Sequence, residues 1–219
     1  MNTVLIRHWG GATIVAGMLA GLLALSGCGG AAQESTAAQA SSSASTSAAA
    51  ATAAAPEEAD ITIADTLENS TDGEHAIEAD GAKAAYTNVA VNKTGEADGD
   101  EADFYGENAA IFATNGATLD LSQMVVKTDG THANAVFSYG DGTTVNVSDS
   151  VIQTSGNCSG GIMTTGGGTM NASNLNIHTT GNSSAAIRSD RGGGTVNVDG
   201  GSYTTAGTGS PVIDRKSVV

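Results

Sequence analysis

The most chemically suggestive stretch of this 219-residue chain is an acidic insertion over residues 96–107, which reads EADGDEADFYGE. Asp98, Asp100, Glu101 and Asp103 lie close together in it. Calcium prefers several oxygen ligands and tolerates flexible geometry, so these four carboxylates are the best candidates for a calcium site. The order of glycine and acidic residues does not fit an EF-hand. The alternative is a solvated acidic loop that binds no ion.

Residues suited to proton transfer are scattered along the chain. Lys127 and His178 occupy equivalent places in a repeat, while Arg188 and Arg191 flank Asp190. A single histidine on a strand surface is usually solvated, and the sequence contains no set of nucleophile, base and orienting group, no zinc-type spacing and no phosphate-binding glycine loop. We therefore assign no catalytic residue, and the sequence favours a non-enzymatic protein over an enzyme.

Threonine and asparagine recur in rows that could bind a sugar chain through hydrogen bonds. The members assigned to this role are Thr144, Asn146, Thr169, Asn171, Thr195 and Asn197, with Tyr139 as an aromatic candidate. The alternative is that the rows only stabilise stacked strands.

These rows belong to a repeat of 25–26 residues. Its first apolar pairs stand at 110–111, 135–136, 161–162, 186–187 and 212–213, in steps of 25, 26, 25 and 26 residues. A second segment alternates Thr and Asn or Asp with apolar residues, which is the period of a strand with one buried face. A third short segment follows, and two residues later comes a glycine, at positions 130, 156, 181 and 207. Such a glycine fits a corner that needs positive φ or tight turning.

Three short strands and one fixed coil length predict a right-handed parallel β-helix, in which each strand pairs with its equivalent in the next coil. An earlier coil is visible around Ile77, Val89 and Gly95, displaced from the next by the acidic insertion. The competing interpretation is an antiparallel sandwich. A sandwich would not require whole units of this length to repeat.

Composition supports thin, turn-rich β structure over an average enzyme. The chain has 30 glycines, two prolines, 4% aromatic residues and a formal net charge of −15. Fifteen of the 23 carboxylates lie over residues 57–107, and basic clusters are absent from the sequence. Nucleic acid is therefore not an expected partner.

The N-terminal residues predict export and membrane attachment. Arg7 precedes an apolar stretch over residues 12–25, which is the layout of a secretory signal. This stretch ends in Leu25-Ser26-Gly27-Cys28, which closely resembles the bacterial lipobox. The resemblance implies lipidation of Cys28 and membrane attachment through it. The alternatives are an ordinary signal peptide that contains a cysteine, or a short uncleaved anchor.

Residues 28–58 are expected to form a flexible tether, because most of this segment is Ala, Ser, Thr and Gln without large apolar side chains. The predicted domains are therefore a signal peptide over 1–27, the tether over 28–58 and a β-helix over 59–213. The last six residues, 214–219, break the repeat and match a reading frame of a sequencing adapter. We expect that they are an artefact and that the natural β-helix continues.

The repeat, over about residues 75–213, resembles the right-handed β-helix surface proteins of bacteria, a group with pertactin-like adhesins, polysaccharide lyases and pectin-binding carbohydrate modules. The resemblance implies an architecture more firmly than an activity. We expect a lipid-anchored adhesin or glycan-contacting module on the bacterial cell surface, with polysaccharide or host surface glycans as partners. The alternatives are a polysaccharide-active, lyase-like enzyme, a degenerate relative of one, or a passive spacer. No cofactor is expected apart from the calcium considered above.

Overall fold

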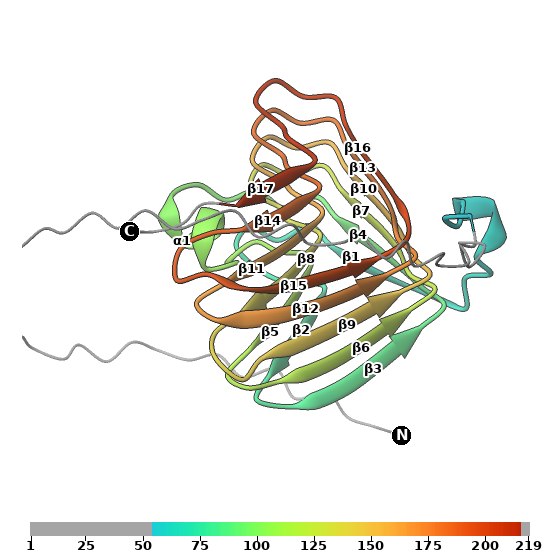
Figure 1. Cartoon of the computed structure of the whole chain (residues 1–219), viewed down its shortest axis with the longest axis horizontal. Coiled ribbons are helices and arrows are strands. Elements are labelled where there is room, and N and C mark those ends of the chain that lie inside the picture. The colour runs from blue at the N-terminus through green and yellow to red at the C-terminus, as the bar shows by residue number, and fades with distance from the viewer. Residues whose placement is uncertain (1–53, 216–219) are drawn as a thin grey trace, which may run out of the picture. The chain divides into compact units, whose positions relative to one another are not determined.

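The computed structural model describes residues 54–215. The predicted signal peptide, Cys28, most of the predicted tether and residues 216–219 lie outside the described residues. Within the described range the chain forms a parallel β-helix of three sheets, which confirms the predicted fold class (Figure 1). Five complete three-strand coils, from β2 to β16, are preceded by β1 and followed by β17.

Each strand from β1 to β14 pairs in parallel with the strand three places later in the chain. The first sheet contains β1 (Asp65–Asn69), β4 (Val89–Lys93), β7 (Val125–Thr128), β10 (Val151–Thr154), β13 (Asn176–Thr179) and β16 (Ser202–Thr205). The second sheet contains β2 (Ile77–Asp80), β5 (Ile111–Thr114), β8 (Val136–Tyr139), β11 (Ile162–Thr165), β14 (Ile187–Ser189) and β17 (Ile213–Arg215). The third sheet contains β3 (Lys83–Thr87), β6 (Thr118–Ser122), β9 (Thr144–Ser148), β12 (Gly168–Ser173) and β15 (Gly194–Asp199).

The core is a set of apolar columns that run along the coil axis. Ile111 is in register with Val136, Val136 with Ile162, and Ile162 with Ile187. Alternation along each strand turns these side chains inward, where they pack with matching columns from the other two sheets. Each coil is therefore stabilised by its two neighbours more than by contacts within itself.

The glycines that follow the first-sheet strands allow the backbones of adjacent coils to approach closely, and they do not adopt a positive φ. None of Gly130, Gly156, Gly181 and Gly207 has a left-handed backbone. A Cβ on Gly156 would instead overlap the carbonyl oxygen of Gly130, and the same clash recurs up the stack. The left-handed conformation occurs two residues later, at His132, Cys158, Ser183 and Gly209. The tight turning that was predicted is present, but its physical reason is the contact between backbones.

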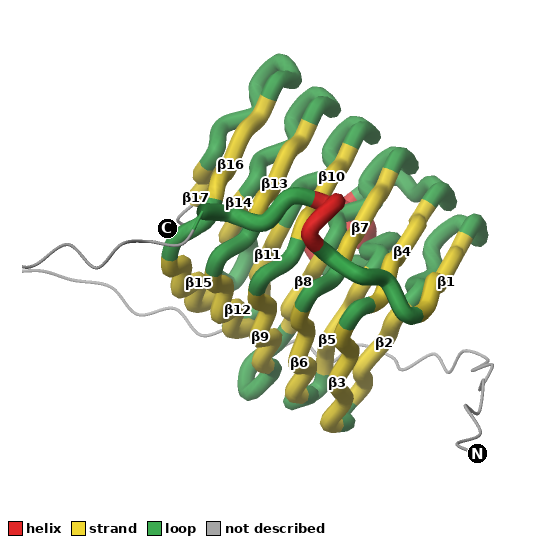
Figure 2. The backbone as a smooth tube through the Cα atoms, turned by 90° about the vertical axis from the view of Figure 1, so that its right-hand side faces the viewer, coloured by secondary structure: helices red, strands yellow, loops and turns green. Residues whose placement is uncertain are grey.

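The segment before β1 packs on the outside of the first sheet. It contains a short 3-10 helix, η1 (Glu58–Asp60), and crosses the strands of that sheet (Figure 2). The Lys127 ammonium lies 2.7 Å from the Glu58 carboxylate, and the Asn176 amide donates to the carbonyl of Pro56 over 3.0 Å. Ile61 packs on Val125 and Val151. The end of the segment assigned to the tether thus contacts the β-helix directly.

Candidate functional site

The outer face of the third sheet carries three polar columns. They arise because alternate residues of each strand point outward and the strands are in register. The columns are Thr118, Thr144, Thr169 and Thr195; then Asp120, Asn146, Asn171 and Asn197; then Ser122, Ser148, Ser173 and Asp199. The outward placement of the predicted Thr and Asn rows is thereby confirmed.

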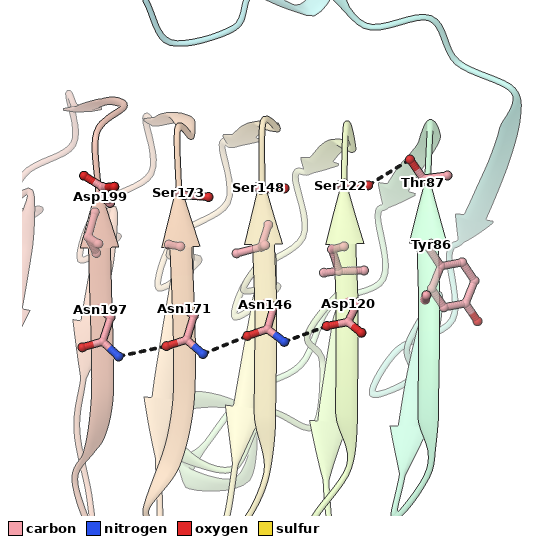
Figure 3. A pocket seen from close by; sticks show the side chains of 15 residues that line it. Tyr86, Thr87, Asp120, Ser122, Asn146, Ser148, Asn171, Ser173, Asn197 and Asp199 are labelled. Atoms are coloured by element: carbon pink, nitrogen blue, oxygen red, sulfur yellow. Dashed lines mark hydrogen bonds between the residues drawn. The ribbon is translucent and has the colours of Figure 1, made fainter. Parts of the chain in front are cut away.

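The middle column is a continuous hydrogen-bonded ladder (Figure 3). The Asn197 amide nitrogen donates to Asn171 Oδ1 over 2.8 Å, and that of Asn171 donates to Asn146 Oδ1 over 2.8 Å. The Asn146 amide then donates to the Asp120 carboxylate over 2.6 Å. Each internal amide uses one N–H and one lone pair in the ladder, so a second N–H and a second lone pair remain for a ligand.

A groove runs across the strands between the asparagine and serine columns, and we call it the asparagine groove. Its volume is about 620 Å³, and its lining extends from β3 to β15. Leu121, Val147 and Ala172, which lie between the two polar columns along their strands, form its floor. The polar groups that line it repeat at the strand spacing of about 4.8 Å. An extended polymer would therefore meet the same groups at each step.

The structure brings together some of the predicted glycan-binding residues and separates others. Asn146, Asn171 and Asn197 line the groove, whereas the threonine column lies on the same face beyond the asparagines. Tyr139 belongs to the second sheet, where its ring makes an edge contact of 5.7 Å with Tyr105. Its hydrophobic neighbours there include Phe137 and Met163, so Tyr139 does not join the groove.

The serine column was missed in the sequence. Ser122, Ser148, Ser173 and Asp199 form one wall of the groove. The available signal was their constant place two residues after each Asp or Asn, since that spacing returns to the same strand face. Small polar residues attract little attention in one repeat, and only the stacked register makes them a wall.

The four predicted calcium ligands have different surroundings. A short helix, α1 (Asp100–Phe104), forms within the insertion. The Arg191 guanidinium donates to Asp100 over 2.7 Å and lies 3.6 Å from the centre of the Phe104 ring. Glu101 is exposed, and the Asp98 side chain is fully exposed. Of these four residues, Asp103 lies in a cluster of potential metal ligands found among the described residues, together with His132 and Cys158.

The basic residues considered for catalysis have structural partners. Lys127, Gln153, His178 and Thr204 form the outward column of the first sheet that the repeat predicts. Lys127 is paired with Glu58, and His178 Nδ1 lies 2.7 Å from the Thr204 hydroxyl. The third basic group, Arg188, is buried and donates to Asp190 over 2.7 Å. This arrangement accounts for each basic group without a substrate.

Comparison with known proteins adds no relative: the chain matches no protein-family model, no curated protein and no solved structure. Between residues 54 and 215 there is also no helix with the length and apolar character needed to cross a bilayer.

Proposed function

We propose that this protein is a non-enzymatic, glycan-contacting β-helix, held at the bacterial cell surface by lipidated Cys28. The observation that supports the binding role is the asparagine groove, with a hydrogen-bonded amide ladder on one side and serine hydroxyls on the other. A linear glycan presents hydroxyl groups at a regular repeat along an extended chain. Amide and hydroxyl groups at a regular repeat are suited to hydrogen-bond it.

The negative charge of the asparagine groove limits the class of glycan that it can bind. The residues that line the groove include Asp120 and Asp199 and no basic residue. The whole chain carries a formal net charge of −15. Like charges in contact oppose association, so neutral or amino-sugar polymers fit the groove better than uronic acid polymers do. The negative charge of the groove therefore disfavours pectin-like substrates, which the lyase alternative would require.

The test is a glycan array probed with the detergent-solubilised full chain. Neutral or amino-sugar polymers should bind, and the double variant Asn146→Ala/Asn171→Ala should lose about tenfold or more in affinity. That estimate takes about 1 kcal/mol for each ladder residue removed, and about 1.4 kcal/mol corresponds to tenfold. The matched control is Gln153→Ala/Thr204→Ala on the outer face of the first sheet, which should bind normally.

Two outcomes would contradict the proposal. If no glycan bound, a passive spacer would be the better description. If incubation with a polysaccharide released unsaturated sugars, the protein would be an enzyme.

A further inference from the structure

A second cluster of chemically active side chains lies away from the groove, where the acidic insertion meets the second and third coils that follow it. We call Asp103, His132 and Cys158 the insertion cluster. One potential ligand atom from each residue lies within 4.8 Å of those of the other two. The cluster combines an imidazole nitrogen, a sulfur and a carboxylate oxygen, a different chemistry from the oxygen-only set considered for calcium.

The repeat itself brings two of the three side chains together. His132 and Cys158 have the same left-handed backbone, with φ of 55° and 54°, at equivalent corners of successive coils. The His132 amide donates to the carbonyl of Asn157 over 2.9 Å, and the Cys158 amide donates to that of Asn182 over 2.8 Å. Stacked coils are separated by about 4.8 Å, so side chains at equivalent corners are neighbours.

The insertion supplies the third side chain by folding back over this corner. Its helix α1 is held there by Ala102, which is fully buried, and by the Thr165 hydroxyl, which donates to the carbonyl of Phe104 over 2.7 Å. Arg191 adds a contact with the Phe104 ring. These contacts place Asp103 Oδ1 3.2 Å from His132 Nδ1.

The facing atoms of Asp103 and His132 are buried polar atoms without a hydrogen bond. His132 is 8% exposed. Its Nδ1 and the Asp103 Oδ1 are buried, and neither has a hydrogen-bond partner, although they lie close to each other. Burying polar atoms without partners is costly, and native proteins rarely do it without a structural or functional reason.

We propose that Asp103, His132 and Cys158 bind a divalent cation of the zinc class. Nitrogen and thiolate ligands favour zinc and similar transition metals, whereas calcium prefers oxygen ligands alone. Three protein ligands leave the fourth tetrahedral position for water. Binding converts the Cys158 thiol into a metal-bound thiolate and releases its proton to solvent, so charge and atoms balance without a redox step.

Two charged side chains, Asp98 and Arg188, lie beside the cluster. With the metal on His132 Nδ1, the opposite ring nitrogen, Nε2, lies 3.8 Å from the Asp98 carboxylate. Metal-bound histidines commonly donate their other ring N–H to a carboxylate, which fixes the orientation of the ring. Arg188 NH1 lies 3.7 Å from Asp103, but this guanidinium is also paired with Asp190 at 2.7 Å. At this distance, and with its side chain fully exposed, Asp98 makes no hydrogen bond with His132 and is only an electrostatic neighbour of the ring.

An entry path is also present. A cavity of about 440 Å³ is lined by Asp103, Phe104, Cys158, Ser183 and Arg188, among others. The competing explanation is an ion pair between protonated His132 and Asp103. An ion pair accounts for two members of the cluster and gives no role to the sulfur, so the sulfur is the group to follow in an experiment.

The experiment is a titration of the detergent-solubilised full chain with Co²⁺, a spectroscopic substitute for zinc. We expect one equivalent to produce a thiolate-to-cobalt charge-transfer band in the near ultraviolet, and Zn²⁺ to abolish that band by displacing the cobalt. Cys158→Ser should remove the band, and it should fold because the next coil has Ser183 at the same corner. His132→Asn should weaken Zn²⁺ binding by at least 100-fold, and asparagine tolerates the left-handed backbone. Asp98→Asn removes only an exposed charge near the ring and should weaken Zn²⁺ binding by less than about tenfold.

Two matched controls should keep the band and the Zn²⁺ affinity. Cys28→Ser removes the other cysteine of the chain, and Glu101→Gln removes an exposed carboxylate from α1. The proposal is overturned if wild-type protein gives no charge-transfer band, or if the band persists in Cys158→Ser. It is also overturned if Ca²⁺ binds in preference to Zn²⁺ and Glu101→Gln abolishes that binding, because the insertion would then be an oxygen-ligand site.

Discussion

At the scale of single residues, the stack of coils makes neighbouring backbones approach so closely that a methyl group matters. Gly156 illustrates this constraint, since its Cβ position is occupied by the carbonyl oxygen of Gly130. The sequence indicated that these glycines mark corners, but it could not reveal which of the two usual reasons applies. Positive φ is a local property of one residue, whereas a clash depends on the adjacent coil.

Gly156→Ala should therefore destabilise the β-helix. We expect a loss of about 1–3 kcal/mol in the free energy of unfolding, as is typical for groups forced into a well-packed site. Urea denaturation followed by circular dichroism measures this change. The adjacent Ser155 is exposed, so Ser155→Ala is the control and should cost less than about 1 kcal/mol. Equal losses in the two variants would contradict the close-approach explanation.

His75 gives the fold a dependence on pH. Its ring stacks on Phe112 with centres 4.6 Å apart, and its Nδ1 lies 2.7 Å from the carbonyl of Ala109. Burial lowers the pKa of His75 below its usual value, although the Ala109 contact and the Glu78 carboxylate partly oppose this effect. The unfolded chain therefore binds a proton at a higher pH than the folded chain does.

The sign of the resulting effect follows from linkage. The contribution of neutral His75 is fully present above the unfolded pKa of about 6.5 and is lost as pH falls toward the lowered pKa of the folded state. The urea midpoint should decrease between pH 7.5 and pH 5.5 (about one unit on either side of that pKa). His75→Gln should show a smaller decrease over the same interval. An equal decrease in the variant would assign the pH dependence to other groups.

At the scale of elements, the strands of the complete coils could be predicted because each repeats the same inward apolar positions. Ile111, Val136, Ile162 and Ile187 fall at the predicted places and are in register. The strand β1 was not predicted, because its sequence DTLEN has Leu67 as its single large apolar residue. The helix α1 was missed for a related reason, since five residues rich in carboxylates carry no helical apolar period.

The insertion cluster also illustrates what the sequence contains and what it leaves out. His132 and Cys158 are 26 residues apart, which is one coil step, so their proximity could have been read from the repeat. The position of Asp103 could not, because it depends on how the insertion packs on the coils. The asparagine groove was likewise predicted only in part. The outward asparagines follow from the repeat, whereas the serine wall becomes visible only when the strands are stacked in register.

Inward and outward positions should respond very differently to substitution. Ile162 is fully buried, so Ile162→Asp should cost about 3 kcal/mol or more and open the adjacent coils to proteases, because an unpaired carboxylate would be buried. Asn171→Ser removes hydrogen bonds from a half-buried ladder on the outer face and should cost about 1 kcal/mol. Urea denaturation and limited proteolysis compare the two. Similar tolerance of both variants would contradict the assignment of faces.

At the scale of the whole molecule, the proposed anchor and the β-helix have separate roles. Residues 54–64 include groups that bind the outside of the first sheet, such as Glu58 and Ile61. These contacts fix where the chain enters the β-helix, independently of how the preceding residues behave. The asparagine groove lies on a different sheet, the third, so the contacts of residues 54–64 with the first sheet do not involve it.

Surface attachment can be tested with an antibody to the repeats on intact cells. Wild-type cells should be labelled, and Cys28→Ala should move the signal from the cells to the medium, because the acyl chains proposed to hold the protein in the membrane would be missing. Undiminished labelling of cells that express Cys28→Ala would contradict lipid anchoring. The Cys158→Ser variant is the control and should remain attached to the cells.

The asparagine ladder also gives the molecule a direction. All three of its bonds have the same sense, each amide donating toward the coil before it, and the series ends on the Asp120 carboxylate. Aligned amide dipoles reinforce one another, as hydrogen-bond chains generally do, and here their positive ends point toward an anion. The groove is therefore electrically asymmetric from β15 to β6. A polymer whose two ends differ chemically would meet donors and acceptors in one order when it lies along the groove and in the reverse order when it is turned around. The groove would therefore distinguish the two orientations of a bound chain as well as its chemical composition.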